Sequence, residues 1–203
     1  TVSMIKDTTK AKSEVKLGGE RKRMAFLFSD IRGFTSMSES RQPEEVVSLI
    51  NTYLDKQSEV IESFNGDIDK YVGDEIMARF TGENMVVDAV QASVKIQEEL
   101  VKMNKEREKA GLPVVEVGVG LNIGDVVVGS MGSHKRMDYT AIGDAVNLAA
   151  RLCSAAEGGH VLVSKAIYDA SGEFKKRFVK QEPIKVKGKA EPIEIFDIPK
   201  PGN

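Results

Sequence analysis

An uninterrupted apolar segment that ends at an acidic residue constrains the fold of this chain more than any other feature. Residues 24–29, Met-Ala-Phe-Leu-Phe-Ser, have the length of a β-strand and predict a strand buried on both faces. Asp30 follows directly, and Gly33 soon after it favours the start of a helix. We therefore expect a carboxylate where a buried strand ends, beside a helix N-terminus. Such a place suits Mg²⁺ bound to a phosphate group, because the carboxylate holds the metal and backbone N–H groups face the phosphate.

A second acidic residue, Asp74, lies in a predicted turn. Residues 68–80 read as two short strands on either side of Val72-Gly-Asp74, which predicts a β-hairpin. If the hairpin brings Asp74 to Asp30, the two carboxylates form a two-metal clamp, which suits in-line displacement at phosphorus. The simpler alternative is that one aspartate ends a strand and the other occupies a turn, since aspartate is common in turns.

The remaining pattern predicts one α/β domain. Pro43, followed by two glutamates, is typical of a helix start. Valines alternate with glutamate and glycine in residues 115–121. The glycines leave one face of that strand without side chains, so another element can pack closely against it. The order strand–helix–strand–strand–helix–strand indicates an α/β (α+β) sandwich of ferredoxin-like, palm type, with a mixed, mainly antiparallel sheet flanked by helices. Helices are expected over residues 43–64, 84–109 and 144–157, and further strands over residues 115–121, 126–128, 137–141, 161–163, 174–180, 184–186 and 193–196.

Domain organisation is predicted to be simple. Residues 1–20 are polar and rich in lysine, and we expect a linker or the end of an upstream connector there. Residues 21–203 are expected to form one domain, because a chain of 203 residues that is 41% hydrophobic can bury one substantial core. The chain does not begin with Met, so we expect it to be part of a longer protein with an upstream regulatory or sensor domain.

Composition excludes several classes of protein. A net charge of -2 gives no reason to expect nucleic acid or an anionic membrane as a partner. A single cysteine, Cys153, cannot form an internal disulfide, and its helical surroundings favour a packed side chain over a nucleophile. The two histidines have no neighbours at zinc-ligand spacing, and no P-loop motif occurs. No apolar stretch has membrane-spanning length and no signal peptide is found, so we expect a cytoplasmic domain whose parent protein could still be membrane-anchored.

Three blocks of sequence carry a resemblance to a known family. They are Phe28-Ser-Asp-Ile-Arg-Gly-Phe-Thr35, Lys70-Tyr-Val-Gly-Asp74 and Asp138-Tyr-Thr-Ala-Ile-Gly-Asp-Ala-Val-Asn147-Leu-Ala-Ala-Arg151. In this order and spacing, they resemble the catalytic domain of class III nucleotidyl cyclases, the adenylyl/guanylyl cyclase family, in its bacterial form. The resemblance extends from about residue 21 to residue 198.

The resemblance implies a metal and phosphate site. Asp30 and Asp74 match the residues that bind two divalent cations, Mg²⁺ or Mn²⁺, and the backbone carbonyl of Ile31 would complete one metal's shell. Backbone N–H groups would face the β- and γ-phosphates at Gly33, Phe34 and Thr35.

It also implies two residues that recognise the base. Lys70 would donate to N1 of adenine, and the hydroxyl of Thr140 would accept from the N6 amine, so the pair favours ATP over GTP. Lys70 shares strand parity with Ile68 and Val72, which places a cation on an otherwise apolar face. The alternatives are a lysine that extends to solvent at a sheet edge and an ordinary strand threonine.

A third group would act on the triphosphate. Asn147 and Arg151 are four residues apart and therefore share a helix face. The resemblance places Asn147 against the ribose, Arg151 on the α-phosphate and Lys187 on the terminal phosphates. A polar surface stripe on the helix, and a solvated lysine cluster around residues 185–189, are the alternatives.

These roles predict an adenylyl cyclase that converts ATP to cyclic AMP and pyrophosphate. In the family the metal aspartates come from one subunit, and the base-reading and Asn–Arg residues come from the other. This chain carries both sets, so the expected assembly is a homodimer with shared sites. The alternatives are a guanylyl cyclase and a catalytically silent cyclase-homology module that only dimerises.

Overall fold

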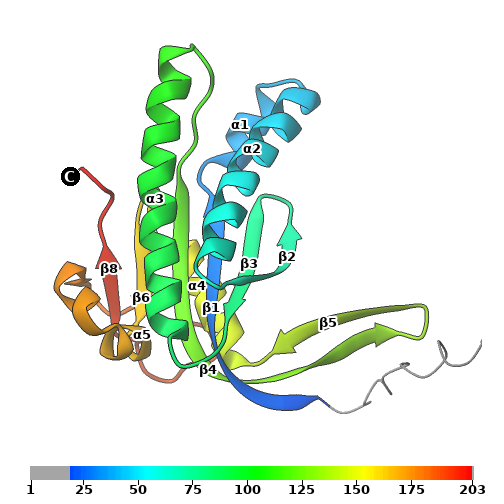
Figure 1. Ribbon diagram of the computed structural model, residues 1–203, viewed down its shortest axis with the longest axis vertical. Coiled ribbons are helices and arrows are strands. Elements are labelled where there is room, and N and C mark those ends of the chain that lie inside the picture. The colour runs from blue at the N-terminus through cyan, green and yellow to red at the C-terminus, as the bar shows by residue number, and fades with distance from the viewer. Residues whose placement is uncertain (1–18, 203) are drawn as a thin grey trace, which may run out of the picture.

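The computed structural model describes residues 19–202, which form one sheet covered by helices on both faces (Figure 1). The expected linker over residues 1–20 lies almost entirely outside the described residues, and Glu20 already belongs to the first strand. The strands follow the order β2-β3-β1-β4-β6-β8-β7, and β5 pairs with β4. The four strands β2, β3, β1 and β4 lie side by side in this order within the sheet, and each is antiparallel to its neighbours. This arrangement confirms the ferredoxin-like prediction.

Strand β1 (Glu20–Ile31) lies at the centre of this sheet and is buried on both faces, as its apolar run predicted. Side chains of Ala25 and Leu27 belong to one hydrophobic cluster, whereas those of Phe26 and Phe28 belong to another. This division follows from the alternation of side chains along a strand. Its partners are β3 (Glu75–Phe80), which forms the predicted hairpin with β2 (Asp67–Val72), and β4 (Val117–Ser133).

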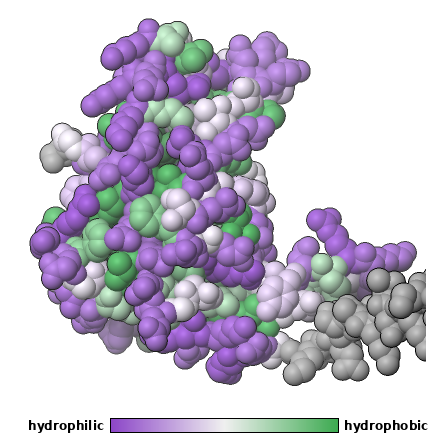
Figure 2. Space-filling view, in the orientation of Figure 1, coloured by the Kyte–Doolittle hydropathy of each residue, from purple (hydrophilic) through white to green (hydrophobic). Residues whose placement is uncertain are grey.

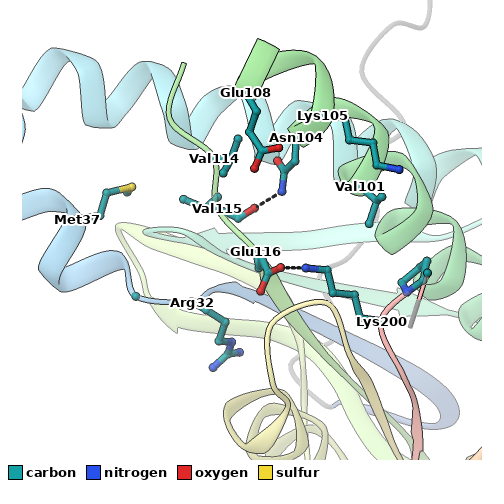
Figure 3. A pocket seen from close by; sticks show the side chains of 13 residues that line it. Arg32, Met37, Val101, Asn104, Lys105, Glu108, Val114, Val115, Glu116 and Lys200 are labelled. Carbon is teal, nitrogen blue, oxygen red and sulfur yellow. Dashed lines mark hydrogen bonds and ion pairs between the residues drawn. The ribbon is translucent and has the colours of Figure 1, made fainter. Parts of the chain in front are cut away.

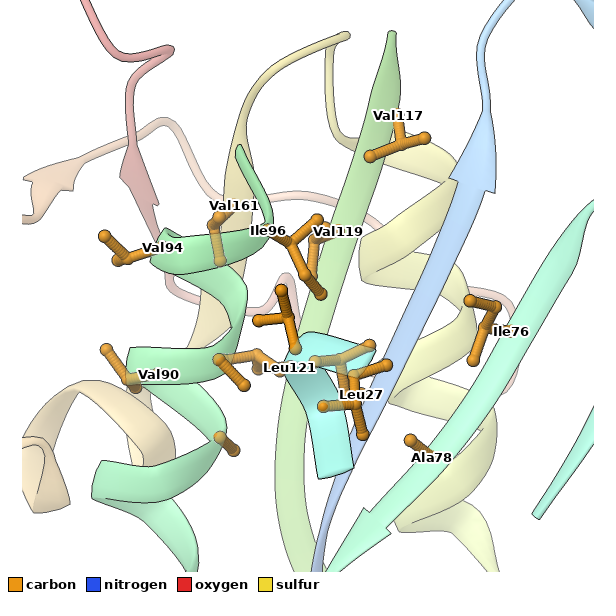
Figure 4. Close-up of a cluster of buried hydrophobic side chains, with 14 of the residues drawn as sticks. Leu27, Ile76, Ala78, Val90, Val94, Ile96, Val117, Val119, Leu121 and Val161 are labelled. Atoms are coloured by element: carbon orange, nitrogen blue, oxygen red, sulfur yellow. The ribbon is translucent and has the colours of Figure 1, made fainter. Parts of the chain in front are cut away.

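Two long helices cover one face of the sheet, and one helix covers the other (Figure 1). Helices α2 (Pro43–Ser63) and α3 (Met85–Lys109) match two predicted helices. Figure 4 shows part of the cluster beneath them, where Val90 and Ile96 of α3 meet Leu27 of β1 and Leu121 of β4. Helix α4 (Asp144–Ala155) covers the opposite face and closes the second cluster.

Helix α4 approaches β4 very closely, because glycine leaves the strand bare there. A Cβ atom on Gly120 would lie 2.1 Å from the backbone nitrogen of Cys153 and 2.5 Å from the carbonyl oxygen of Ala149. Backbone atoms of a helix cannot rotate away from such a contact as a flexible side chain can. The predicted close packing is therefore confirmed, and it fixes the position of α4.

A methyl group at this contact is expected to displace α4. Gly120→Ala should lower the free energy of unfolding by about 1–3 kcal/mol, because overpacking forces backbone to move. Urea denaturation followed by circular dichroism measures the change. Gly129→Ala in the same strand is the matched control, since its Cβ would lie 3.1 Å from the nearest atom. Equal stability of the two variants would contradict this account of the packing.

The far end of β4 leaves the body of the molecule with β5 (Arg136–Ile142) as a two-stranded arm. We call residues 127–142 the β4–β5 arm; it projects sideways in Figure 1, and Figure 2 shows it standing away from the body. Met137, Tyr139 and Ile142 are exposed on it. Two separate strands were predicted over residues 115–121 and 126–128, but β4 is continuous through both.

The C-terminal part differs most from the prediction. Strand β6 (Val161–Ser164) runs parallel to β4 and pairs with β8 (Ile195–Ile198). The predicted strand over residues 174–180 is wrong for most of its length, because residues 172–177 form a 3₁₀ helix and the paired strand of this range is β7 (Val179–Lys180). The strand predicted over residues 184–186 is reduced to one bridge between Ile184 and Ile193. Helix α5 (Lys165–Ala170), capped by the Ser164 side chain, was not predicted.

Candidate active site

Asp30 and Asp74 meet where β1 ends. Ser29 of β1 lies opposite Ile76 of β3, so the turn between β2 and β3 falls just beyond Asp30. Gly73 adopts a φ of 61° in that turn, a conformation that side chains disfavour. A surface cavity of about 470 Å³ is lined by both aspartates, by Ile31, Gly33, Phe34, Thr35 and Ser36, and by Glu39. The three residues assigned to metal and the three whose backbone N–H groups were assigned to the β- and γ-phosphates therefore line one cavity, whereas Arg151 and Lys187 do not.

The carboxyl group of Asp30 is perturbed by its surroundings. Burial, a hydrogen-bonding contact with Asp74 and the charge of Asp74 raise the pKa of Asp30 from 3.8 to about 6. Arg32 opposes this rise, since its Nη2 atom lies 4.0 Å from Asp30 Oδ2 and positive charge favours the ionised form. Burial and the charge of Asp74 also raise the pKa of Glu75. The site thus concentrates negative charge in a half-buried position.

The oxygen ligands of this cavity fit a hard divalent cation that also binds a phosphate group. Carboxylate and carbonyl oxygens are the ligands that Mg²⁺ and Mn²⁺ prefer, and a cation would relieve the repulsion between Asp30 and Asp74. Among residues 19–202 no group of three or more His, Cys, Asp or Glu side chains is placed to hold a metal ion. The two aspartates would therefore need further oxygen ligands, such as the carbonyl of Ile31 and phosphate oxygens.

The backbone that the sequence assigned to phosphate belongs to a short helix. Helix α1 (Phe34–Glu39) starts directly after Gly33, whose φ of 68° is left-handed. The first N–H groups of a helix have no partner within it, so those of residues 34 and 35 are available to an acceptor. Both residues line the same cavity as the aspartates.

Arg32 ties this strand end to α4. Its Nη2 atom donates to the carbonyl oxygen of Cys153 at 2.8 Å. Burial raises the pKa of the Cys153 thiol from 9.0 to about 12, while Arg32 acts in the opposite direction. Cys153 is therefore a packed side chain at the centre of the fold, and its thiol is not a nucleophile at neutral pH.

The raised pKa gives an expected result for chemical labelling. A thiol with a pKa of about 12 instead of 9.0 has a thiolate fraction about a thousandfold lower at pH 8, and only the thiolate reacts. Iodoacetamide should label the folded protein more than a hundredfold more slowly than the protein in urea. Cys153 is the single cysteine of the chain, so mass spectrometry of the intact protein reports this site alone. Equally fast labelling in both states would contradict the buried placement.

The two residues assigned to the base also meet in one cavity. Asp69, Lys70 and Thr140 line a second cavity of about 400 Å³, together with Tyr71 and residues 136–139 of the β4–β5 arm. Thr140 Oγ1 donates to Asp69 Oδ2 at 2.9 Å, and Lys70 Nζ lies 3.4 Å from the same oxygen. One carboxylate oxygen therefore links a residue of β2 to a residue of β5.

The predicted strand parity of Lys70 holds with Val72 but not with Ile68. Pairing between β2 and β3 shifts register between Ile68 and Lys70, so alternation along β2 is interrupted. Val72 is 59% exposed, and the face that the sequence predicted to be apolar does not form. Lys70 instead occupies the rim of a polar cavity.

The triphosphate group of residues gathers around α4. Arg151 donates a hydrogen bond from Nη1 to the carbonyl oxygen of Lys187, which brings these two residues together across a long sequence separation. Asn147 is exposed one turn earlier on the same helix. Lys189 forms an ion pair with Asp144, which is the first residue of that helix. The helix thus presents a polar edge next to the loop over residues 187–189.

The three groups of residues occupy separate places in one chain. None of Lys70, Thr140, Asn147, Arg151 and Lys187 lines the cavity beside Asp30 and Asp74. Conversely, neither aspartate lines the cavity of Lys70 and Thr140. Within one copy of the chain, the residues assigned to the metals, the base and the triphosphate therefore share neither cavity.

A larger cavity of about 640 Å³ lies elsewhere and contains little of this chemistry. It opens between Met37, the C-terminal part of α3 and the segment before β4 (Figure 3). Of the residues assigned from the sequence, only Gly33 lines it. Its charged groups are partly satisfied internally, since Glu116 pairs with Lys200 (Figure 3).

Sequence reasoning missed two residues of the base cavity region. Asp69 and Arg79 received no role, yet Asp69 contacts both Lys70 and Thr140, and Arg79 Nη1 donates to Asp69 Oδ1 at 3.1 Å. Adjacent residues of a regular strand point to opposite faces, so the pair Asp69-Lys70 gave no signal of a shared site. The register shift in β2 was the missing information.

Comparison with known proteins agrees with this geometry. The family described as "Adenylate and Guanylate cyclase catalytic domain" matches residues 19–198. A relative described as an adenylate cyclase, from Anabaena cylindrica, is 40% identical over 186 residues, which are 87% of this chain and 37% of the relative. Among solved structures, the guanylyl cyclase Cya2 gives a TM-score of 0.81 at 36% identity and covers 92% of this chain and 98% of that chain. The adenylyl cyclase CyaB from P. aeruginosa gives 0.82 at 34% identity, covering 90% and 96%.

The fold and the carboxylate pair define a palm-type domain suited to phosphoryl chemistry. More specifically, the chain belongs to the adenylate and guanylate cyclase catalytic domain family, as the match over residues 19–198 shows. It spans only 37% of the Anabaena cylindrica relative and 28% of an adenylate cyclase from Rhizobium meliloti. Within the described part of the chain, none of the helices combines the length and apolar character needed to cross a membrane.

Proposed function

We propose that this domain is an adenylyl cyclase that converts ATP to cyclic AMP and pyrophosphate as a homodimer. The observation that supports it best is the convergence of Lys70 and Thr140 in one cavity. An ammonium donor and a hydroxyl acceptor side by side match N1 and the N6 amine of adenine. Guanine presents an N1–H donor and an O6 acceptor instead, which calls for a carboxylate near N1.

The remaining residues receive roles from the resemblance and from their chemistry. Arg151 would stabilise the negative charge that develops on the α-phosphate, because its fork of donors suits phosphoryl oxygens. Asn147 would hold the ribose so that its 3′-oxygen lies in line with the α-phosphorus, which is the kind of positioning that phosphoryl transfer requires. Lys187 and the N–H groups of Gly33, Phe34 and Thr35 would hold the β- and γ-phosphates.

Asp30, Asp74 and the carbonyl of Ile31 would hold two divalent cations, Mg²⁺ or Mn²⁺. Bound there, the cations would lower the proton affinity of the ribose 3′-oxygen and neutralise triphosphate charge. In the reaction, a bond forms between the 3′-oxygen and the α-phosphorus, and the bond from that phosphorus to pyrophosphate breaks. Because ATP is the proposed substrate, we place the domain in the cytoplasm.

The separation of the two cavities in one chain supports shared sites. Asp30 and Asp74 of one protomer would work with the base-reading residues and with Arg151 of its partner, and the symmetric arrangement would give two equivalent sites. Exposed apolar side chains on the β4–β5 arm, among them Met137, Tyr139 and Ile142, give a second copy apolar surface to cover.

Product formation tests the proposal directly. Purified protein is incubated with ATP or GTP, with Mg²⁺ or Mn²⁺, over a hundredfold range of protein concentration. Cyclic AMP as the main product, with specific activity that rises with protein concentration, is expected. Cyclic GMP as the main product would establish the guanylyl alternative. No cyclic product from folded, dimeric protein would establish the silent module.

A further inference from the structure

Asp69 is the most deeply buried charged group near the base cavity, and its three partners are all cations or hydroxyl donors. Its side chain is only 1% exposed. Oδ2 accepts from Thr140 Oγ1 at 2.9 Å and lies 3.4 Å from Lys70 Nζ. Oδ1 accepts from Arg79 Nη1 at 3.1 Å. A buried carboxylate is costly unless such partners surround it, so this arrangement has a defined geometry.

The chemistry of a carboxylate decides how Thr140 can behave. A threonine hydroxyl can both donate and accept, so alone it fits the N6 amine of adenine and O6 of guanine equally well. An ionised carboxylate only accepts. The single proton of the Thr140 hydroxyl is therefore committed to Asp69, and only its lone pairs remain for a base. A group with lone pairs alone matches the N6 amine and rejects O6.

We propose that Asp69 is a positioning residue that determines nucleotide specificity, by converting Thr140 into an obligate acceptor and holding Lys70 beside it. This inference rests on the proposed function, which assigns Lys70 and Thr140 to the base. Asp69 itself does not need to touch the nucleotide. It sets the donor and acceptor pattern that the two other side chains present.

Arg79 holds this carboxylate in place. Its side chain is 15% exposed and bridges Asp69 and Asp67, with Nε donating to Asp67 Oδ2 at 2.8 Å. The guanidinium carbon also lies 5.6 Å from the ring centre of Tyr139, the neighbour of Thr140 on the β4–β5 arm. Asp67 contacts the same arginine as Asp69 but forms no contact with Thr140, so it provides a matched control.

The decisive variant is Asp69→Asn. The amide keeps one acceptor oxygen and replaces the other oxygen with a donor. Arg79 can only donate, so the amide oxygen is expected to face Arg79 and the NH₂ group to face Thr140 and Lys70. The NH₂ group would then donate to the Thr140 hydroxyl, whose own proton becomes free to reach O6 of guanine.

We expect the ratio of kcat/KM for ATP to that for GTP to fall by about tenfold or more in Asp69→Asn, since one hydrogen bond changes direction. Asp67→Asn should leave the ratio within about twofold of wild type. In a Thr140→Val background, Asp69→Asn should change the ratio much less than in wild type, because the hydroxyl is absent and only the contact between Asp69 and Lys70 remains. An unchanged ratio in Asp69→Asn, or an equal fall in Asp67→Asn, would overturn the inference.

A binding measurement separates this inference from the proposed function. 3′-DeoxyATP and 3′-deoxyGTP lack the attacking hydroxyl, so their affinities can be measured without turnover. If wild-type protein forms no cyclic product, the proposed function fails, yet the affinity ratio still tests Asp69. If Asp69→Asn does not fold by circular dichroism, Thr140→Ser replaces it. Its hydroxyl can still donate to Asp69, so the ATP preference should survive, and loss of that preference would overturn the inference.

Discussion

Arg151→Ala is expected to lower kcat for cyclic AMP formation by about a hundredfold to a thousandfold, which is typical of losing one donor to transition-state charge. If Arg151 acts only as negative charge develops, kcat and kcat/KM should fall by similar factors and KM should change little. Steady-state kinetics at saturating metal measures both. The side chain is half-buried at the edge of α4, and within residues 19–202 its hydrogen bond goes to the carbonyl of Lys187, so the protein should remain folded.

Arg177→Ala is the control for that measurement. Arg177 is also a partly exposed arginine, paired with Glu98 at 3.8 Å, but it lies in the 3₁₀ segment away from both nucleotide cavities. Its kcat should match that of wild type. A fall in Arg151→Ala that appears only in KM would assign Arg151 to ground-state binding and not to the transition state.

Mixing two inactive variants should restore activity. Asp30→Ala lacks a proposed metal ligand and Arg151→Ala lacks the proposed charge-stabilising group, so each homodimer should have two defective sites. In a mixed dimer, one site receives both defects and the other receives none. With random exchange at equal amounts, half of the dimers are mixed and half of their sites are intact, so about a quarter of wild-type activity is expected.

The assay needs proof that subunits exchanged. Differently tagged variants can be co-purified through both tags, which isolates mixed dimers and raises the expected value to about half of wild-type activity. Mixing Asp30→Ala with Asp74→Ala is the internal control. Both defects lie on the same half of the site, so no active site can form. Inactive mixed dimers of Asp30→Ala and Arg151→Ala would disprove the shared site.

Local sequence pattern was sufficient for the elements that carry the proposed metal ligands. The apolar run of β1 is long enough to identify a strand buried on both faces, and Asp30 follows it directly. Pro43 and the two glutamates after it identify the start of α2. Both signals are local, so no knowledge of the tertiary structure was needed.

Elements whose conformation depends on tertiary contacts were not predictable in the same way. Phe174 and Phe178 occur in a stretch that resembles a strand, yet they pack on the main core as part of a 3₁₀ segment and the residue after it. The same limit applies to the base cavity. Its geometry depends on the register shift in β2 and on an arm that brings Thr140 of β5 to Asp69, and neither is encoded in a local period.

The β4–β5 arm also affects how such a domain can evolve. All side chains from residue 136 to residue 139 are exposed, so exchanges among them cost the fold little stability. A lineage with this arm can therefore sample new base-reading residues without first accumulating stabilising mutations elsewhere. Asp69 is different, because its side chain is buried against Arg79. Amino-acid substitutions should therefore accumulate on the arm more readily than at Asp69, the buried carboxylate that orients the Thr140 hydroxyl.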